Sequence, residues 1–538
     1  MSIIHFNLHR SYPSQAKEVN VQRHNLKHDH SPLTPFIAMT NLPSNTHPHC
    51  WNDPGLRNLN SLLLTCYLGA IANGYINSLI SNLIANPRWH TDISGLSQTS
   101  RLGLVTSAQS LGCIAAFFPA PWLSDTYGRR TGIIFGCIGM ICGSVSQIFC
   151  KTFDQFLGAR LVVGFASIFN TISSSALLVE LAHPRQRGVA GALFNTCFFI
   201  GSITAAWTSY GAMRLDSSWS WKIPVAAQSA WVLGQLGLVV AVPESPRWLV
   251  RNGEEEVARE MLVKYHANGD EGNELVRFEL AKMRASAEME AQDGMSTGWS
   301  SLYTTPGNRK RLLLSVVIGV ATQWVGNGII SFYLAPVLQT VGITDSFQQQ
   351  GINGGLQIYN WCLACGAALL SEKAGRRRLF LTSAGTMLIF MIMVTICSAL
   401  YSSTRSVAAG YAVIVFLFLF LGGYVIGLTP IPILYVNEIW PSHIRTKGTS
   451  VFWVSQAVAI CFNQFVNPVA LERIAWMYYL VYVAVLVFVI IFMFLYVPET
   501  KGLSLEEVSN IFDRERRNSI ELTVVEANLH LRIAEERL

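Results

Sequence analysis

Amide side chains interrupt an otherwise apolar stretch of the chain, "GAIANGYINSLISNL", which runs from Gly69 to Leu83. Asn73, Asn77 and Asn82 lie in this stretch, and it contains no acidic or basic residue. An amide buried in an apolar environment is costly unless it finds a hydrogen-bond partner, and on a membrane-spanning helix it usually faces protein or a watery cavity. These residues therefore indicate uncharged hydrogen bonding inside a group of helices.

Acidic and basic residues recur in three short motifs that each occur twice. The pairs are "DTYGRR" and "EKAGRRR", "ELAHPRQR" and "EIWPSHIR", and "PESPRW" and "PETKG". The copies follow one another in the same order, about 250 residues apart, as in chains built from an internal repeat. In the second pair, Glu180 and Arg187 have the separation of seven residues that Glu438 and Arg445 have. The chain is therefore expected to consist of two similar halves.

Ion pairing is the chemistry that these motifs offer, because arginine is always charged and forms forked hydrogen bonds to a carboxylate. We expect one set of residues to clasp helix ends of the two halves together on one side of a membrane: Asp125, Arg129, Glu180, Arg187, Glu244, Glu372, Arg376, Glu438 and Arg445. Opening this clasp would admit solvent. In an alternative interpretation the arginines only anchor loops at the membrane surface, which explains neither the matched acids nor their repeated spacing.

Membrane-spanning helices are the elements that must position these residues. The 538 residues are 51% hydrophobic and only 13% charged, whereas charged residues make up about a quarter of a typical soluble domain. A helix needs about 20 apolar residues to cross a bilayer. Twelve such runs lie near 59–84, 102–122, 131–149, 155–181, 188–209, 221–242, 311–335, 350–370, 379–400, 409–433, 449–468 and 473–497. The sequence predicts an all-α membrane protein with twelve transmembrane helices.

The repeat and the apolar runs divide the chain into five parts. We expect a disordered N-terminal tail (1–58), an N-terminal six-helix half (59–242), a charged helical linker (243–310), a C-terminal six-helix half (311–497) and a C-terminal tail (498–538). Short loops on the side of the motifs carry ten basic residues, and loops on the other side carry seven. This bias favours a cytoplasmic location for the motifs, the linker and both termini.

Several other classes of function find no support in the residues. The apolar runs contain no paired acids, metal-ligand cluster or Ser/His arrangement, so we expect neither an enzyme nor a cofactor or metal site. Seven of the twelve histidines lie in the N-terminal tail, which we interpret as polar and disordered in preference to metal-binding. The net charge of +6 does not indicate a nucleic-acid partner.

The repeated motifs resemble the signature loops of the sugar porter branch of the major facilitator superfamily, in register from about Leu59 to Phe512. Within that branch the chain is most similar to the fungal lactose- and cellodextrin-permease-like group, through "QWVGNGIISFYL", "INGGLQIYN", "SWKIP", "NQFVNPVALE" and "KYHANGDEGNELV". The resemblance implies the major facilitator fold and alternating access to a central site that binds sugar hydroxyls.

The same resemblance implies which side chains bind the solute. The candidates are Gln323, Asn327, Asn360, Thr322, Tyr333 and Ser202. Amides and hydroxyls suit an uncharged polyol, and aromatic faces cover the C–H face of a sugar ring. Gln323 and Asn327 are four residues apart and are expected to share a helix face. Ser202 and Ile433 stand where many hexose carriers have Gln and Trp, which argues against assuming glucose. Each amide could instead bridge two helices.

Proton coupling is expected to be absent from the first helix. Proton-coupled sugar porters have a Gly-aromatic-Asp triplet there, which resembles "GYI" in this chain, so that Ile76 takes the place of the titrating Asp. Arg160 matches the arginine that normally pairs with that Asp, and arginine does not lose its proton at physiological pH. Arg160 must then find amides, carbonyls, water or an anion, and Asn73 or Asn77 is expected to provide part of that shell.

These observations predict a plasma-membrane carrier that moves a sugar or related polyol by alternating access, with the solute and the lipid bilayer as its partners. Three alternatives stay open: a proton-coupled sugar symporter, a carrier or exporter of a non-sugar metabolite with Arg160 facing an acidic solute, and a sensor that binds sugar without transporting it. A sensor is less favoured because only about 40 residues follow Pro498, and sensors of this family usually have a long cytoplasmic extension.

Overall fold

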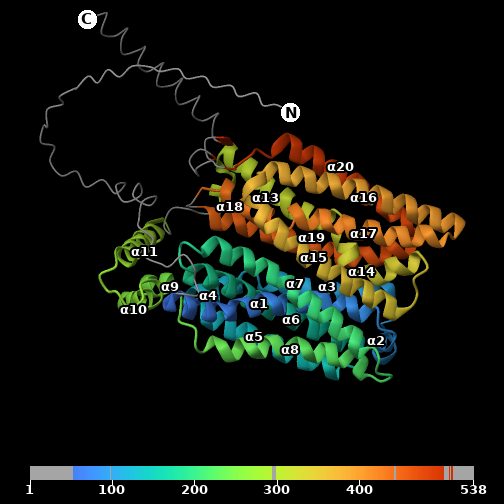
Figure 1. Ribbon diagram of the computed structural model, residues 1–538, viewed down its shortest axis with the longest axis horizontal. Helices are drawn as coiled ribbons and strands as arrows, with labels where there is room; N and C mark the ends of the chain where they lie inside the picture. The colour runs from blue at the N-terminus through green and yellow to red at the C-terminus, as the bar shows by residue number, and fades with distance from the viewer. Residues whose placement is uncertain are drawn as a thin grey trace, which may run out of the picture. The chain divides into compact units, whose positions relative to one another are not determined.

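The computed structural model describes residues 53–96, 98–293, 299–441 and 444–501, together with 508 and 511–512. Within these residues the chain is helical, and the only strand-like pairing is an isolated bridge between Ser94 and Thr152 (Figure 1). The histidine-rich segment and most of both expected tails lie outside the described residues.

The helices fall into three groups along the chain. The N-terminal half contains α1 (Pro54–Ile84), α2 (Pro87–Asp92), α3 (Thr99–Ala116), α4 (Pro119–Tyr127), α5 (Arg129–Phe149), α6 (Phe153–Leu181), α7 (Arg187–Ala212) and α8 (Trp219–Val239). The linker contains α9 (Pro246–Arg251), α10 (Glu255–His266), α11 (Glu274–Asp293) and α12 (Ser301–Thr304). The C-terminal half contains α13 (Pro306–Trp324), α14 (Asn327–Thr340), α15 (Ser346–Ala374), α16 (Arg376–Thr404), α17 (Val407–Gly427), α18 (Ile431–Ile439), α19 (Arg445–Ile474), a 3₁₀ turn (Ala475–Met477) and α20 (Tyr478–Tyr496).

Each of the twelve apolar runs lies on one helix or on two helices joined by a break, which confirms the predicted all-helical fold. The breaks follow from residues that interrupt a helix: Pro119 begins α4, Gly326 precedes α14, and Pro430 precedes α18. On length and hydropathy alone, seven segments of the described chain qualify as spans, or eight with the bent pair α3 and α4. One of those seven, Lys447–Tyr496, comprises both α19 and α20.

The first spanning helix starts earlier than its apolar run. The side chain of Asp53 accepts a hydrogen bond from the backbone N–H of Leu56 at 3.1 Å, and Pro54 occupies the first turn. An acidic cap followed by proline is a strong signal for a helix N-terminus. Helix α1 therefore includes residues 54–58, which the sequence had assigned to the tail.

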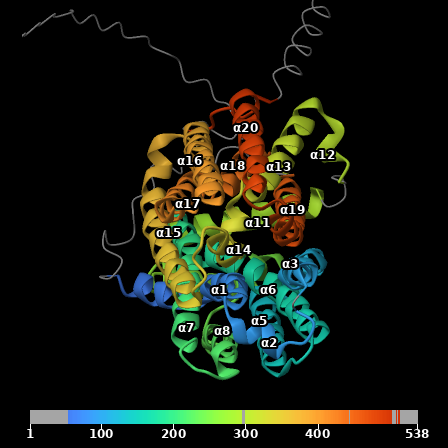
Figure 2. The same ribbon diagram turned by 90° about the vertical axis from the view of Figure 1, so that its right-hand side faces the viewer.

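The two halves pack against each other through a few helix pairs. These are α3 with α19, α7 with α15, and α1 with α14, and Figure 2 shows the blue-to-green and yellow-to-red groups meeting there. At Gly103 of α3 an added Cβ would lie 2.8 Å from the carbonyl oxygen of Phe465 in α19, so the backbones approach closely. Leu83 of α1 and Val337 of α14 belong to one buried apolar cluster that continues across this boundary.

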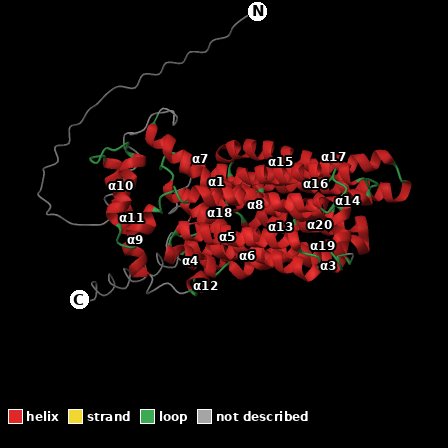
Figure 3. Ribbon diagram, turned by 90° about the horizontal axis from the view of Figure 1, so that it is seen from below, coloured by secondary structure: helices red, strands yellow, loops and turns green. Residues whose placement is uncertain are grey.

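The linker helices α9, α10 and α11 pack together at one end of the N-terminal half (Figure 3). Trp248 of α9 donates its indole N–H to the carbonyl oxygen of Asp125 at 3.0 Å. His266, at the end of α10, lies with Nδ1 2.8 Å from Glu279 of α11 and Nε2 3.1 Å from the carbonyl oxygen of Leu181 in α6. These contacts fasten the linker to the ends of α4 and α6.

Candidate functional site

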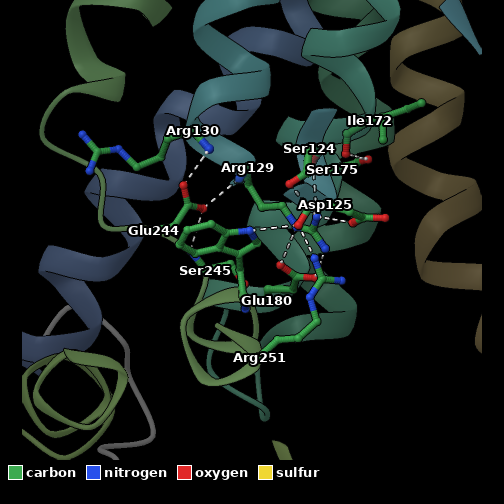
Figure 4. A network of polar contacts seen from close by, with 11 residues as sticks. Ser124, Asp125, Arg129, Arg130, Ile172, Ser175, Glu180, Glu244, Ser245 and Arg251 are labelled. Carbon is green, nitrogen blue, oxygen red and sulfur yellow. Dashed lines mark hydrogen bonds and ion pairs between the residues drawn. The ribbon is translucent and has the colours of Figure 1, made fainter. Parts of the chain in front are cut away.

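An ion-pair network joins helices of the N-terminal half at the end nearest the linker (Figure 4). Arg129, the first residue of α5, makes a forked contact to Glu180 of α6, with Nε at 3.2 Å and Nη2 at 3.3 Å from its two carboxylate oxygens. Its Nη1 also contacts the carboxylate of Asp125 and the carbonyl oxygen of Ser124, both in α4. We call Asp125, Arg129, Glu180 and Glu244 the N-cluster.

Glu244 completes the N-cluster by capping α5. Its carboxylate accepts hydrogen bonds from the backbone N–H groups of Arg129 at 2.9 Å and Arg130 at 3.1 Å. Gly128 precedes them with φ +99°, and a Cβ there would lie 2.4 Å from the Glu244 carboxylate, so only glycine fits. Burial raises the pKa of Glu244, although the backbone donors of Ser245, Arg130 and Arg129 oppose that shift.

The C-terminal half repeats this arrangement around Arg376, the first residue of α16. Arg376 contacts Glu438 of α18 through Nη2 at 2.9 Å, and Glu499 accepts from the backbone N–H groups of Arg376 at 2.8 Å and Arg377 at 3.2 Å. We call Arg376, Glu438 and Glu499 the C-cluster. Burial alone would raise the pKa of Glu499, but its backbone hydrogen bonds outweigh burial and lower it. The side chain of Glu372 lies outside the described residues.

The ion pairs of each cluster lie within that cluster's own half of the molecule. This corrects the expectation that they clasp the two halves together. Arg129 pairs with acids of its own half, and so does Arg376. Arg187 and Arg445 point elsewhere: Arg187 donates to the carbonyl oxygen of Ala182 at 3.5 Å and Arg445 to that of Trp440 at 3.3 Å. The clusters therefore fix helix ends inside each half. We call the end of the molecule that carries them the cluster side.

The break between α13 and α14 changes the geometry of the predicted solute-binding amides. Gln323 lies in the last turn of α13 and Asn327 begins α14, with Gly326 between them in the left-handed conformation at φ +101°. The two residues therefore do not share one helix face, and the expectation that they do is wrong. Both are buried, with 6% and 7% of their surface exposed, and the carbonyl oxygen of Gln323 accepts from Asn463 at 2.9 Å.

The other predicted binding residues differ in whether their side chains already form hydrogen bonds to protein atoms. Thr322 accepts from Gln456 at 3.0 Å, and Tyr333 donates to the carbonyl oxygen of Gln464 at 2.5 Å. In contrast, the side-chain oxygens of Asn327 and Asn360 are buried and have no hydrogen-bond partner in the described part of the chain. Asn327 and Asn360 each therefore keep an amide oxygen that a solute hydroxyl could satisfy.

Ser202 of α7 takes part in a helix contact instead of lining the centre of the protein. Its hydroxyl accepts from Ser78 of α1 at 2.7 Å and lies 3.4 Å from the carbonyl oxygen of Gly74. A Cβ at Gly74 would lie 1.9 Å from the carbonyl oxygen of Phe198, so α1 and α7 are in close backbone contact here. The structure thus assigns Ser202 to packing between these helices.

The amides of the first span form contacts to both halves. Asn77 donates to Asn73 at 2.8 Å, and Gln109 of α3 donates to Asn77 at 3.3 Å. At the end of α1 opposite the cluster side, Asn353 of α15 donates to the side chain of Asn82 at 2.7 Å, and Gln350 donates to its carbonyl oxygen at 2.7 Å.

We call Asn82, Gln350 and Asn353 the amide latch, because these residues connect the two halves. A hydrogen bond of 2.5 Å from Ser110 of α3 to Gln464 of α19 joins the halves as well. The sequence analysis had not selected Gln350, Asn353 or Gln464, although "QQQGINGG" places several amides at the start of an apolar run.

Arg160 of α6 is buried, with 1% of its surface exposed, and its Nε and Nη1 have no hydrogen-bond partner among the described residues. Ile76 is completely buried and lies in the same apolar cluster as Val163, one turn from Arg160. No hydrogen bond connects Arg160 to Asn73 or Asn77. The amide shell expected around Arg160 is thus not formed in this structure.

Comparison with known proteins gives matches that agree on a family of transporters. The family model described as sugar (and other) transporter matches residues 60–512. The chain is 27% identical over 467 residues to the low-affinity glucose transporter HXT1 of Saccharomyces cerevisiae, covering 82% of this chain and 80% of the relative. It is 28% identical over 424 residues to the hexose transporter HXT10 of the same yeast, covering 77% and 76%.

Solved structures show the same fold at lower identity. The inward open conformation of the xylose transporter XylE from E. coli matches with a TM-score of 0.70 at 21% identity, covering 84% of this chain and 99% of that one. The major facilitator superfamily proton:xylose symporter XylE bound to 6-bromo-6-deoxy-D-glucose matches with a TM-score of 0.70 at 22% identity, with the same coverage. The fold is therefore that of the major facilitator superfamily. Membership of the fungal lactose-permease-like group stays a prediction.

Proposed function

The chain belongs to the family of sugar (and other) transporters, and we propose that it carries a sugar or related polyol across the plasma membrane by alternating access. The observation that carries this proposal is the pair of buried amide oxygens on Asn327 and Asn360, which have no partner in the described chain. Their helices α14 and α15 pack against α1 and α7 of the other half. A solute hydroxyl at this boundary would supply the missing hydrogen bonds.

The distribution of contacts supports movement of two rigid halves. Ion pairs hold each half together on the cluster side, whereas hydrogen bonds between the halves come from the amide latch and from Ser110 with Gln464. Rocking of the halves would break the neutral contacts and leave the ion pairs intact. We propose that the cluster side is cytoplasmic, as the excess of basic residues in its loops favours, and that both termini lie there too.

Transport without proton coupling through α1 is part of this proposal. In the described spanning helices, acidic side chains occur only near helix ends, as with Asp154 and Glu180 of α6. Ile76 is buried and apolar, and α1 contains no carboxylate or histidine whose protonation could change near neutral pH as the halves move. A facilitative carrier fits these residues better than a symporter does.

The proposal is tested by uptake of labelled mono- and disaccharides in a transporter-null host, repeated as counterflow in proteoliposomes. We expect saturable exchange of at least one of these solutes. Asn327→Ala and Asn360→Ala should each raise its KM about fivefold, since a lost neutral hydrogen bond costs about 1 kcal/mol.

The matched control is Gln339→Ala, which removes an exposed amide from the same helix as Asn327 and should leave KM unchanged. Correctly inserted protein that exchanges none of the solutes would contradict the proposal. So would KM values for Asn327→Ala and Asn360→Ala that equal the KM of the Gln339→Ala control.

A further inference from the structure

Arg160 is a buried cation without a counter-charge. It lies two turns into α6, and its Nε and Nη1 have no hydrogen-bond partner among the described residues. An unpaired charge inside a protein costs several kcal/mol, and intramembrane charges are normally paired or face a watery pathway. A folded protein that keeps such a residue therefore needs a partner for it in at least one functional state.

The described chain does not supply that partner. The thiol of Cys113 in α3 lies near Arg160, but it already donates to the carbonyl oxygen of Gly164 at 3.3 Å. The acids of α6 itself, Asp154 and Glu180, lie in its first and last turns. Ile76, buried in the neighbouring apolar cluster, carries no charge.

The surroundings of Arg160 offer hydrogen bonds to hydroxyl groups. Helix α3 touches α6 at Gly164, one turn beyond Arg160, where an added Cβ would lie 2.0 Å from the carbonyl oxygen of Gln109. Gln109 continues the row of amides through Asn77 to Asn73. The residue after Gln109 is Ser110, which bonds to the other half. Arg160 thus lies on a helix that packs against α1 and α3, and both of these helices contact the other half.

We propose that Arg160 binds the carboxylate of the transported solute, so that the solutes of this carrier include acidic sugars, either uronates or aldonates. A guanidinium group fits a planar carboxylate through two parallel hydrogen bonds. The amides on α1 and α3 would then bind hydroxyl groups next to the carboxylate. This inference rests on the proposed function and specifies the solute class of the same carrier.

The decisive measurement compares solutes that differ in one carboxylate. D-Glucuronate is compared with D-glucose, and D-gluconate with D-sorbitol, both as inhibitors of exchange in proteoliposomes and as ligands that raise the thermal midpoint of the purified protein. The protein should bind at least one acid tenfold or more tightly than its neutral counterpart, because a hydrogen-bonded charge pair is stronger than a neutral hydrogen bond.

Variants of Arg160 then test the residue itself. Arg160→Gln should reduce the ratio of acid to neutral affinity by at least tenfold, and Arg160→Lys should restore part of it, because lysine keeps the charge but lacks the fork. The matched control is Arg88→Gln, which removes an arginine paired with the exposed Asp216 on the opposite side. It should keep the ratio of the unmodified protein.

Three outcomes would overturn the inference. Binding of glucose or sorbitol without tighter binding of either acid by the unmodified protein would do so even if no Arg160 variant folds. An unchanged affinity ratio in folded Arg160→Gln would also do so. A requirement for chloride in neutral-sugar exchange, lost in Arg160→Gln, would assign the site to an inorganic anion. Absence of exchange with every neutral and acidic solute would instead count against the proposed function.

Discussion

The two ends of the helical bundle use different chemistry. Contacts that must persist within a half are charged, and contacts between the halves that must break are neutral. On the cluster side, charged contacts join helices within a half, as with Arg129 and Glu180 or Arg376 and Glu438. On the opposite side, uncharged amides join one half to the other, as with Asn82 and Asn353.

The magnitudes of these contacts explain the division. Removing one partner of a buried ion pair costs about 3–5 kcal/mol, whereas a neutral hydrogen bond contributes about 1 kcal/mol. A carrier that changes its open side in every cycle must break the contacts between its halves and keep the contacts within them. Weak neutral bonds at the boundary and strong charged bonds inside each half fulfil both requirements.

The largest expected effect is that of Arg129→Ala. The variant leaves Glu180, whose side chain is 13% exposed, without its forked partner and also removes the contact to Asp125. We expect the free energy of unfolding to fall by about 3–5 kcal/mol. Thermal unfolding of the detergent-purified protein, together with its level in the membrane, measures this change.

Arg88→Ala is the control for a surface pair, because Asp216 is 96% exposed. It should leave the thermal midpoint essentially unchanged, because an exposed ion pair contributes little to stability. Equal thermal midpoints for Arg129→Ala and the unmodified protein would show that the N-cluster does not hold its half together.

Next in size is the effect of alanine at the glycines that precede the two capped helices. At Gly128 a Cβ would lie 2.4 Å from Glu244, and at Gly375 a Cβ would lie 2.9 Å from Glu499, both with positive φ. We expect each substitution to cost about 1–3 kcal/mol, with Gly128→Ala the more damaging because its contact is closer. Thermal midpoints of both variants measure the costs.

Gly158→Ala is the control for these two substitutions, since no atom lies within 4 Å of a Cβ at that position in α6. Alanine favours a helix over glycine by about 1 kcal/mol, so this variant should be at least as stable as the unmodified protein. If Gly375→Ala lowered the thermal midpoint more than Gly128→Ala does, the N-cluster would not be the more tightly packed of the two clusters.

The sequence predicted the fold far better than it predicted the partners of individual side chains. A bilayer demands about 20 apolar residues per span, and that requirement leaves little freedom in placing helices. An internal repeat, however, gives both halves the same acids and arginines. Spacing alone therefore cannot tell whether Glu180 pairs within its half or across the boundary.

The candidate site shows the same limit. The break at Gly326 separates Gln323 from Asn327, and a glycine in an apolar run signals such a break only weakly. Ser202 illustrates the opposite case, since its hydroxyl is already bonded to Ser78. Such partners depend on how helices distant in sequence pack together, which a single chain does not encode locally.

A smaller effect is expected from breaking the amide latch. Asn353→Ala removes the 2.7 Å bond to Asn82. This loss should shift the equilibrium between closed and open forms of that side by about fivefold, equivalent to about 1 kcal/mol. Spin labels at Thr91 and Thr344, exposed residues of the two halves, would report a larger population at the longer distance.

Gln348→Ala, which alters an exposed amide near the start of the same helix, should leave the distance distribution unchanged. Because the latch is uncharged, raising the salt concentration should not mimic Asn353→Ala. A strong salt effect on the distribution would mean that charges, and not amides, control this boundary.

The smallest expected effect concerns how the caps of the two clusters respond to acid. Backbone hydrogen bonds lower the pKa of Glu499 below its usual 4.5 despite burial, so its contribution to stability is present above about pH 4.5 and is lost as the pH falls through its folded-state value. Burial raises the pKa of Glu244, so its contribution to stability has the opposite sign and is lost as the pH rises through its folded-state pKa.

Glu499→Gln should therefore reduce the loss of thermal stability between about pH 6 and pH 3.5, whereas Glu244→Gln should make the decline steeper. Thermal midpoints measured across this range distinguish the two, and equal curves for both variants would mean that the two caps, so similar in geometry, are also electrostatically equivalent.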